Sequence, residues 1–227
     1  MRVVTIDGPA GAGKSTVARR LADRIGWRLL DTGAMYRAVA LAAIRAGVDL
    51  TSDEALGRLV ESVAVELPPG RVLLDGEDVS DLIRSVEVTR STRHPADSPS
   101  VRRRLVAWQR EFAGSEREVV TEGRDQGTIV FPDAFRKFFL TATDEERARR
   151  RLAEFDARGE PVGFEEVLRD LRDRDAQDSA RAIAPMRPAD DATVVDTTGM
   201  DLDRVVALIE AEVLGAGRAV AGERRAT

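Results

Sequence analysis

A glycine-rich segment near the start of the chain carries the clearest chemical pattern. Residues 8–15 read GPAGAGKS and match the pattern G-x-x-x-x-G-K-[ST] in full. Glycines let backbone N–H groups turn toward a polyphosphate, and a helix that follows presents its positive N-terminal end to the anion. We expect Lys14 to reach the β and γ phosphates and the Ser15 hydroxyl to ligate Mg²⁺. The predicted ATP-binding segment consists of Gly8, Pro9, Ala10, Gly11, Ala12, Gly13, Lys14, Ser15 and Thr16.

The surroundings of this segment support the interpretation. A β-branched run at 2–6 precedes it, and Val17, Leu21 and Ile25 recur after it at helical spacing. A glycine-rich turn that fits the pattern by chance would lack this strand and helix. The loop alone does not separate kinases from GTPases, motor ATPases or transport ATPases, so a second group of residues must decide.

Arginines provide that second group, because a planar guanidinium binds phosphate oxygens in pairs. Arg37 follows a strand and a turn, Arg124 follows a strand directly, and further arginines cluster at 147–151 and at 172–181. Those on helices have a simpler interpretation as solvated faces with ion pairs, as for Arg149 or Arg172. Arg124 and Asp125 are harder to explain as members of a solvated helix face, because residues beyond the carboxyl ends of parallel strands line ligand crevices.

The elements that must position these residues alternate in the way of a parallel α/β sheet. We predict strands at 2–6, 27–30, 118–121, 138–140 and 194–195, and helices from Lys14, from Asp31 or Thr32 to Ile44, from Pro99, from Thr143, at 164–176 and after Asp201. Short strands at 63–67 and 71–74 predict a small antiparallel insertion that ends near Ser98. His94, the single histidine, is interpreted as a loop residue before Pro95 and not as a catalytic base.

Composition excludes several classes of protein. The 227 residues carry a formal net charge of −5 and no cysteine, which argues against a general nucleic-acid or membrane-surface binder and excludes disulfides and thiolate zinc sites. No apolar run is long enough to span a bilayer, and the chain begins with a strand rather than a signal peptide. We expect a cytoplasmic protein, monomeric, with small-molecule substrates and with neither nucleic acid nor membrane as partner.

Together, these segments closely resemble the bacterial cytidylate kinases. The resemblance rests on the runs 6–16 and 30–37, on GEDV at 76–79 with Ile83 and Arg84, on EGRDQGT at 122–128 with VFPDA at 130–134, and on the stretch 174–185 that ends RAIAP. It covers nearly the whole chain in order, from residue 2 to about 210.

The resemblance implies an α/β fold of the P-loop kinase type, with three layers, a parallel central sheet, an inserted nucleoside-monophosphate-binding domain and a short lid. The implied boundaries are a core at 1–31 with the phosphate loop, a monophosphate-binding domain at 32–107 with its antiparallel insertion at about 63–98, core at 108–147, a lid at 148–163, and core with the C-terminal helix at 164–227.

The resemblance also implies a role for each matching residue. Arg37 and Arg124 hold the acceptor phosphate, and Arg102 and Asp125 read the cytosine edge with help from Thr32. Arg174 and Asp178 meet the sugar. Lys14, Arg124, Arg181 and the lid arginines Arg147 and Arg151 surround the transferring phosphate, with Arg147 also stacked on adenine near residues 197–199. Where the family tends to place a serine against the base, this chain has Thr92 and Arg93, so Thr92 is the candidate substitute.

The expected reaction is therefore transfer of the γ-phosphoryl group of ATP, with Mg²⁺, to CMP or dCMP. Two alternatives stay open at the level of sequence. One is a P-loop kinase for another nucleotide or for a metabolite such as shikimate, against which the long middle insertion argues. The other is a nucleotide-dependent switch, which would leave the acceptor-side arginines without a purpose.

Overall fold

The computed structural model describes residues 1–157 and 159–223 and divides them into two compact units. The first unit combines residues 1–29 with the chain from 118 onward, and the second is the continuous segment 30–117. The second unit thus includes the whole of helix α6 (Pro99–Ser115). The expected lid at 148–163 lies in the first unit, and residue 158 within it falls outside the described residues.

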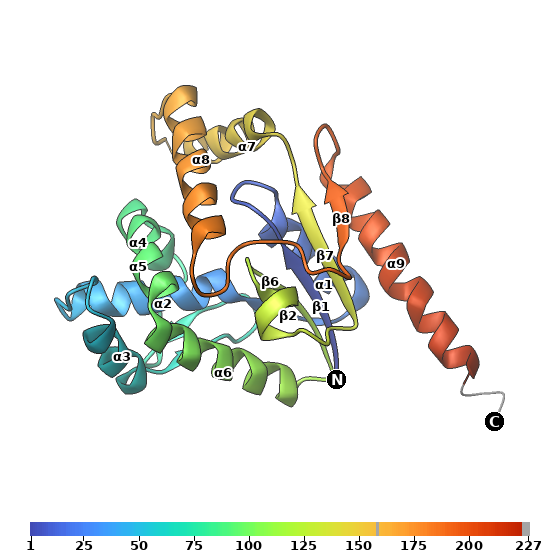
Figure 1. The fold of residues 1–227 in the computed structure, drawn as a ribbon, viewed down its shortest axis with the longest axis horizontal. Coiled ribbons are helices and arrows are strands. Elements are labelled where there is room, and N and C mark those ends of the chain that lie inside the picture. The colour runs from blue at the N-terminus through green and yellow to red at the C-terminus, as the bar shows by residue number, and fades with distance from the viewer. Residues whose placement is uncertain (158, 224–227) are drawn as a thin grey trace. The chain divides into compact units, whose positions relative to one another are not determined.

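A five-stranded sheet forms the centre of the first unit (Figure 1). Its order is β2-β6-β1-β7-β8, and β6, β1, β7 and β8 run parallel to their neighbours. The strands are β1 (Arg2–Asp7), β2 (Arg28–Asp31), β6 (Glu118–Glu122), β7 (Arg136–Thr141) and β8 (Thr193–Asp196). The chain passes into the second unit within β2. The predicted parallel α/β sheet is confirmed.

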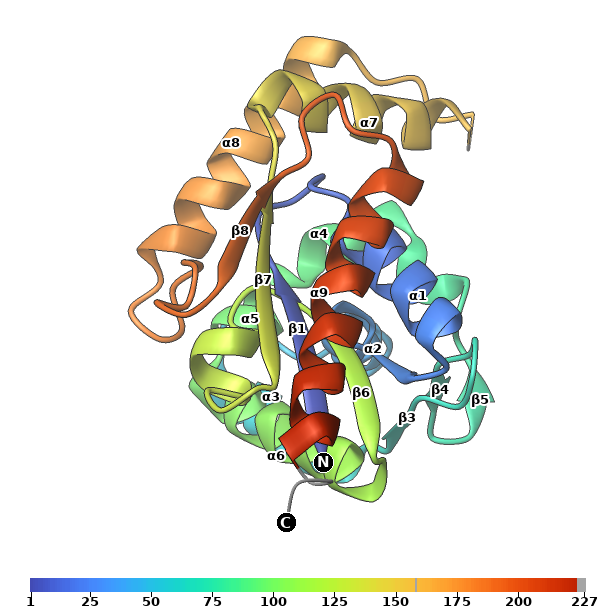
Figure 2. The ribbon, with the colours of Figure 1, turned by 90° about the vertical axis from the view of Figure 1, so that its right-hand side faces the viewer.

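Helices α1 (Lys14–Ile25) and α9 (Leu202–Glu223) lie side by side on one face of this sheet (Figure 2). Their apolar sides and the sheet bury one continuous core, which includes Ile6, Leu21, Phe138 and Ile209. Helix α9 continues to Glu223. Its N-terminus is capped as predicted, since Asp201 accepts the N–H of Arg204 at 2.8 Å.

Helices α7 (Asp144–Asp156) and α8 (Phe164–Ala180) pack against each other beyond the carboxyl end of β7 (Figure 1). The Thr143 hydroxyl accepts the N–H of Glu146 at 3.3 Å, as in a capping box, at the predicted start of this helix. Ala10 of the phosphate loop packs with Ala148, Val167 and Leu171 of these helices. The two helices therefore share a small core with the loop.

The second unit contains helices and a small antiparallel sheet. Its elements are α2 (Thr32–Arg45), α3 (Asp53–Ser62), β3 (Val65–Glu66), β4 (Leu73–Leu74), β5 (Glu77–Asp78), a 3-10 helix (Leu82–Arg84), α4 (Val86–Ser91), α5 (Arg93–Asp97) and α6 (Pro99–Ser115). The antiparallel insertion is confirmed, but it ends at Asp78, and residues 82–97 are largely helical rather than part of it. His94 lies in α5 and not in a loop, because Pro95 occupies the first helical turn, where its missing N–H costs little.

No helix in residues 1–157 and 159–223 combines the length and apolar character that a membrane span requires.

Candidate active site

The phosphate loop connects β1 to α1, in the strand–loop–helix order that its sequence predicts. Gly8, Gly11 and Gly13 all adopt positive φ angles, and Gly13 is the N-cap of α1 in the left-handed region. A Cβ at Gly11 would lie 3.0 Å from the Cβ of Arg147, so α7 packs directly on the loop backbone there. The loop is thus fixed from both its own helix and α7.

Lys14 is the buried cation of this loop. It is only 6% exposed, and its Nζ donates to the carbonyl of Pro9 at 2.7 Å. Burial, followed by the positive charge of Arg124, lowers the pKa of Lys14 to about 7, against the opposing charge of Glu122. An anion bound here would therefore stabilise the protonated, positively charged form of Lys14.

Three arginines surround one buried carboxylate next to this lysine. Asp178 of α8 accepts from Arg124 Nε at 2.8 Å and pairs with Arg181 Nη2 at 2.7 Å. Burial by itself raises the pKa of Asp178, but Arg124, Arg181 and Arg174 together lower it below its usual range. The first unit thus brings together Lys14 with the predicted Arg124, Arg174, Asp178 and Arg181. This concentration of positive charge suits a phosphate group.

Arg174 and Arg151 complete the set from the helical hairpin. Arg174 keeps an exposed surface, yet partial loss of solvation, followed by the charges of Arg124, Arg151 and Arg181, lowers its pKa. Arg151 pairs with Glu154 at 2.5 Å and stacks on Phe155. Because the charges of Arg124, Arg151 and Arg181 act on the pKa of Arg174, these four guanidinium groups lie close to one another.

Arg147 lies differently from what we expected of a residue that meets phosphate. It is 4% exposed, and its guanidinium donates to the carbonyls of Ala142 at 3.2 Å and Ala10 at 2.9 Å and to the carboxylates of Asp175 and Asp144. Asp175 in turn accepts the N–H of Ala10 at 3.2 Å. Arg147 and Asp175 therefore hold the phosphate-loop backbone in this structure.

Glu122, the last residue of β6, is a site residue that sequence reasoning missed. It is buried, and it accepts the Ser15 hydroxyl at 3.0 Å. A hydroxyl and a carboxylate at one point are hard oxygen donors of the kind Mg²⁺ prefers. The donor set thus fits the ion expected at Ser15. The sequence feature that could have identified Glu122 was its position at the carboxyl end of a predicted strand. Within the described residues, no three acidic or histidine side chains gather as a metal-binding group.

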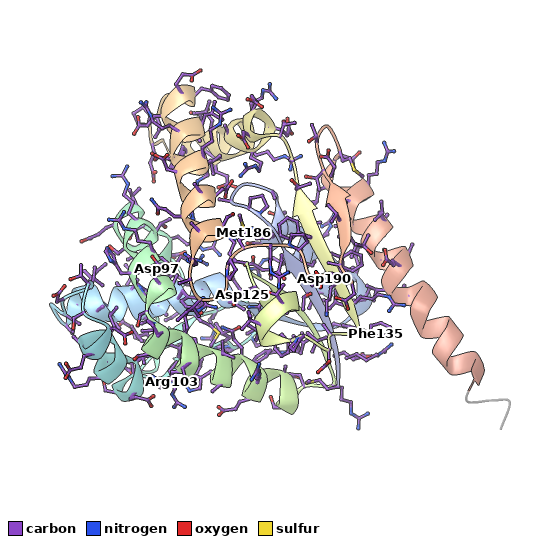
Figure 3. All side chains as sticks on the ribbon, in the orientation of Figure 1. Asp97, Arg103, Asp125, Phe135, Met186 and Asp190 are labelled. Carbon is purple, nitrogen blue, oxygen red and sulfur yellow. The ribbon has the colours of Figure 1, made fainter. Side chains whose placement is uncertain are left out.

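Asp125 follows Arg124 and is buried just before a π-helix at Gln126–Val130. Figure 3 labels Asp125 beyond the end of β6, and Met186 on the segment that follows α8. The N–H of Met186 donates to the carbonyl of Asp178 at 2.9 Å, which ties that segment to the helix carrying the arginine cluster.

The sequence as a whole matches the model of one protein family, Cytidylate kinase, over residues 4–214. The chain belongs to the cytidylate kinase family. It is 50% identical over 220 residues to a cytidylate kinase of Pelotomaculum thermopropionicum, covering 95% of this chain and 96% of the relative. A cytidylate kinase of Pseudomonas paraeruginosa is 48% identical over 213 residues, with 91% and 93% covered.

Among solved structures, an uncharacterized protein from Eubacterium ventriosum is similar in fold, with a TM-score of 0.54 at 13% identity and 94% and 98% of the two chains covered. At that identity the likeness concerns the fold alone.

The remaining predicted residues of this cytidylate kinase family member lie in the second unit. Thr32 is the buried first residue of α2, and Arg37 pairs with Asp31 at 3.5 Å while its Nε has no hydrogen-bond partner among the described residues. Arg102 is buried in the first turn of α6, with Nη1 3.4 Å from the carbonyl of Ala96. The Thr92 hydroxyl donates to the carbonyl of Val88 at 2.7 Å. Its oxygen keeps acceptor capacity.

Proposed function

We propose that this chain transfers the γ-phosphoryl group of ATP to CMP or dCMP, giving ADP and CDP or dCDP. The observation that carries the proposal is the convergence of Arg124, Arg174 and Arg181 around Asp178, with Lys14 close to Arg124 and Arg174, in a chain that belongs to the cytidylate kinase family. A phosphate loop supplies the donor side, and the arginines beyond β6 and on α8 supply charge for the acceptor and the moving group.

Catalysis in this proposal is positioning and charge stabilisation. The acceptor is a phosphate oxygen that is already anionic near neutral pH, so the reaction needs no strong general base. Transfer of a phosphoryl group passes through a loose in-line transition state, whose charge spreads over the equatorial oxygens. Lys14, Arg124 and Arg181 neutralise that charge, and Arg151 approaches from the lid. Preorganised cations of this kind supply much of the rate enhancement of such sites.

Mg²⁺ would be held by Ser15 with Glu122 beside it, and it would supply charge neutralisation on the polyphosphate. The lid at 148–163 closes over the bound substrates and excludes water, which would otherwise compete as acceptor. Arg147 acts through the loop backbone that it contacts, and not on the phosphate directly.

Arg150 is the better candidate for the adenine. Its guanidinium donates to the hydroxyl and carbonyl of Thr197, at 3.0 and 2.7 Å, and its Nη1 lies 3.9 Å from where a Cβ of Gly13 would stand. A guanidinium plane held beside the phosphate loop suits stacking on a base. This replaces the stacking that we expected for Arg147.

On the acceptor side, Arg37 binds the monophosphate together with Arg124, and Arg102 and Asp125 read cytosine, with Thr32 assisting. Asp125 accepts from the amino group of cytosine, which in uracil is a carbonyl. Arg174 and Asp178 contact the sugar. The protein works as a cytoplasmic monomer on these small molecules.

A coupled assay of ADP release tests the proposal. It uses ATP, Mg²⁺ and CMP, dCMP, UMP, AMP, GMP or shikimate in turn, and we expect fast release with CMP and dCMP only. Asp125→Asn should lower the CMP-over-UMP preference roughly 5- to 100-fold, because one mispaired buried group costs about 1–3 kcal/mol. Asp133→Asn, a nearby exposed carboxylate, is the matched control. Turnover of another acceptor in preference to CMP would overturn the proposal.

A further inference from the structure

Asp7 is a buried carboxylate that the proposed mechanism does not use. It is the last residue of β1, directly before the phosphate loop, and it is 4% exposed. Its Oδ1 accepts the N–H of Gln126 at 2.9 Å and its Oδ2 accepts the N–H of Gly127 at 2.7 Å. A buried carboxylate without such donors would be strongly unfavourable. The two hydrogen bonds therefore fix the Asp7 carboxylate and the backbone of Gln126 and Gly127 relative to each other.

The two N–H groups begin the π-helix that follows Asp125. Short π-helical turns leave the ordinary helical hydrogen-bond pattern and need other partners to be stable. Here Asp7 provides the acceptors from β1, and the Thr121 hydroxyl of β6 donates to Gln126 Oε1 at 2.9 Å. The turn is therefore held by two neighbouring strands of the sheet.

The π-helical turn also packs closely against β1. A Cβ at Gly127 would lie 2.9 Å from Thr5 Oγ1 and 3.4 Å from Asp7 Oδ2, and 3.3 Å from the side chain of Lys137. Only glycine allows the backbone this close. The distance between the turn and β1 is consequently fixed by contact as well as by hydrogen bonds.

The preceding end of the same segment is held by the same strand. The N–H of Gly123 donates to the carbonyl of Ile6 at 3.1 Å. The segment 123–127 is thus fastened at one end to Ile6 and at the other to Asp7, and the two residues between these points are Arg124 and Asp125. Fixing both ends restricts the backbone from which both side chains project.

We propose that Asp7 is a positioning residue, which fixes the segment 123–127 to the start of the phosphate loop and so sets Arg124 and Asp125 for the acceptor nucleotide. This rests on the proposed function, because it takes these two side chains as acceptor-binding. The same strand end then leads into the ATP-binding loop and holds the acceptor-binding segment. A displacement of about 1 Å in a substrate-positioning group can lower the reaction rate by orders of magnitude. Loss of the contacts of Asp7 should therefore affect the reaction measurably.

The test is Asp7→Asn, assayed at pH 8. The burial that raises the pKa of Asp7 to about 7 leaves it largely ionised there. The amide keeps the shape, but its NH₂ group faces one of the two N–H donors. We expect the KM for CMP to rise at least tenfold, the KM for ATP to rise by clearly less, since Asp7 also contributes charge near Lys14, and amide hydrogen exchange of the peptide 123–131 to quicken. Asp78→Asn, an exposed carboxylate that also accepts two bonds in a turn, is the control and should leave all three unchanged.

Thr121→Val serves if Asp7→Asn does not fold. It keeps the shape of a buried β6 residue, removes only the bond to Gln126, and should raise the KM for CMP two- to fivefold with the KM for ATP unchanged. Equal rises in both KM values, or faster exchange at 123–131 without a change in the KM for CMP, would overturn the positioning role. A wild-type chain that fails to phosphorylate CMP would instead refute the proposed function, whatever the variants do.

Discussion

Lys14 is the residue whose chemistry depends most on its surroundings. It is buried beside Arg124 and Arg174, while Glu122 and Asp7 oppose their charge. Without an anion the loop therefore carries a lysine with a pKa near 7. A polyphosphate adds negative charge within reach of Nζ, which favours the protonated form.

Nucleotide binding should consequently take up protons. At pH 8 the free protein holds Lys14 largely neutral, and the bound anion raises its pKa above the pH of the solution, so the lysine gains a proton. Calorimetric titration with a non-hydrolysable ATP analogue and Mg²⁺, in two buffers of different ionisation enthalpy, measures this uptake. Lys14→Met should abolish it. The same proton uptake in that variant would place the titrating group elsewhere.

The site residues fall into two classes of predictability. Lys14, Ser15 and Arg124 were predicted because a motif or a strand end fixes their place along the backbone. Arg147 shows what such reasoning lacks, since its direction depends on Ala10 and Asp175, far from it in sequence. The partnership of Ser15 with Glu122 likewise needed the register of β1 and β6.

At the scale of elements, the phosphate loop, α7 and α8 form one connected group. Asp175 of α8 accepts the N–H of Ala10, and Arg147 of α7 donates to the carbonyl of Ala10 and to Asp175. The peptide groups flanking Ala10 are thereby held by both helices. A movement of these helices must alter the loop, and in the proposed function this would couple the expected lid to the ATP phosphates.

Asp175→Asn should therefore weaken ATP binding. The amide loses the ionic bond to Arg147 and leaves a buried guanidinium short of an acceptor, a loss of about 1.5–3 kcal/mol for a charged hydrogen bond. We expect the KM for ATP to rise about tenfold or more with a smaller change for CMP, measured in the ADP-release assay. Asp173→Asn, exposed on the same helix, is the control. A selective effect on CMP would contradict this link.

Most of the regular elements were predictable from sequence, and the exceptions have physical causes. α1, α2 and α6 carry clear caps and periodic apolar residues, as Ser98 capping α6 illustrates. The short helices α4 and α5 span few turns and depend on packing against α2, so local pattern alone does not predict them. The helix α3 was missed although Ser52 caps it.

At the scale of the whole molecule, the proposed ATP contacts all belong to one of the two units. The phosphate loop, Arg150, Arg151 and Arg181 lie in the first unit, and Thr32, Arg37 and Arg102 lie in the second. We therefore expect binding of ATP alone to protect residues of the first unit.

Hydrogen exchange with the ATP analogue and Mg²⁺, without CMP, should show protection in peptides from 1–29 and from 118–200, and little in peptides from 30–117. Groups that bind a ligand directly lose local opening motions, and others do so only if they are coupled. Addition of CMP should then protect peptides around 30–40 and 98–104. Early protection of the second unit by the analogue alone would argue against this division of the substrates.

The order of strands in the central sheet also bears on how the protein is made. β1 leaves the ribosome well before its partners, which are residues 118–122 and 136–141. At about 10 residues per second of synthesis, this apolar strand waits for roughly ten seconds without them. The segment 30–117, by contrast, is continuous, and its helices pack on one another within it, as α3 does on α6. Vectorial translation thus favours a nascent chain whose second unit has formed while β1 stays exposed, and it gives chaperones a defined apolar segment to protect until β6 and β7 arrive.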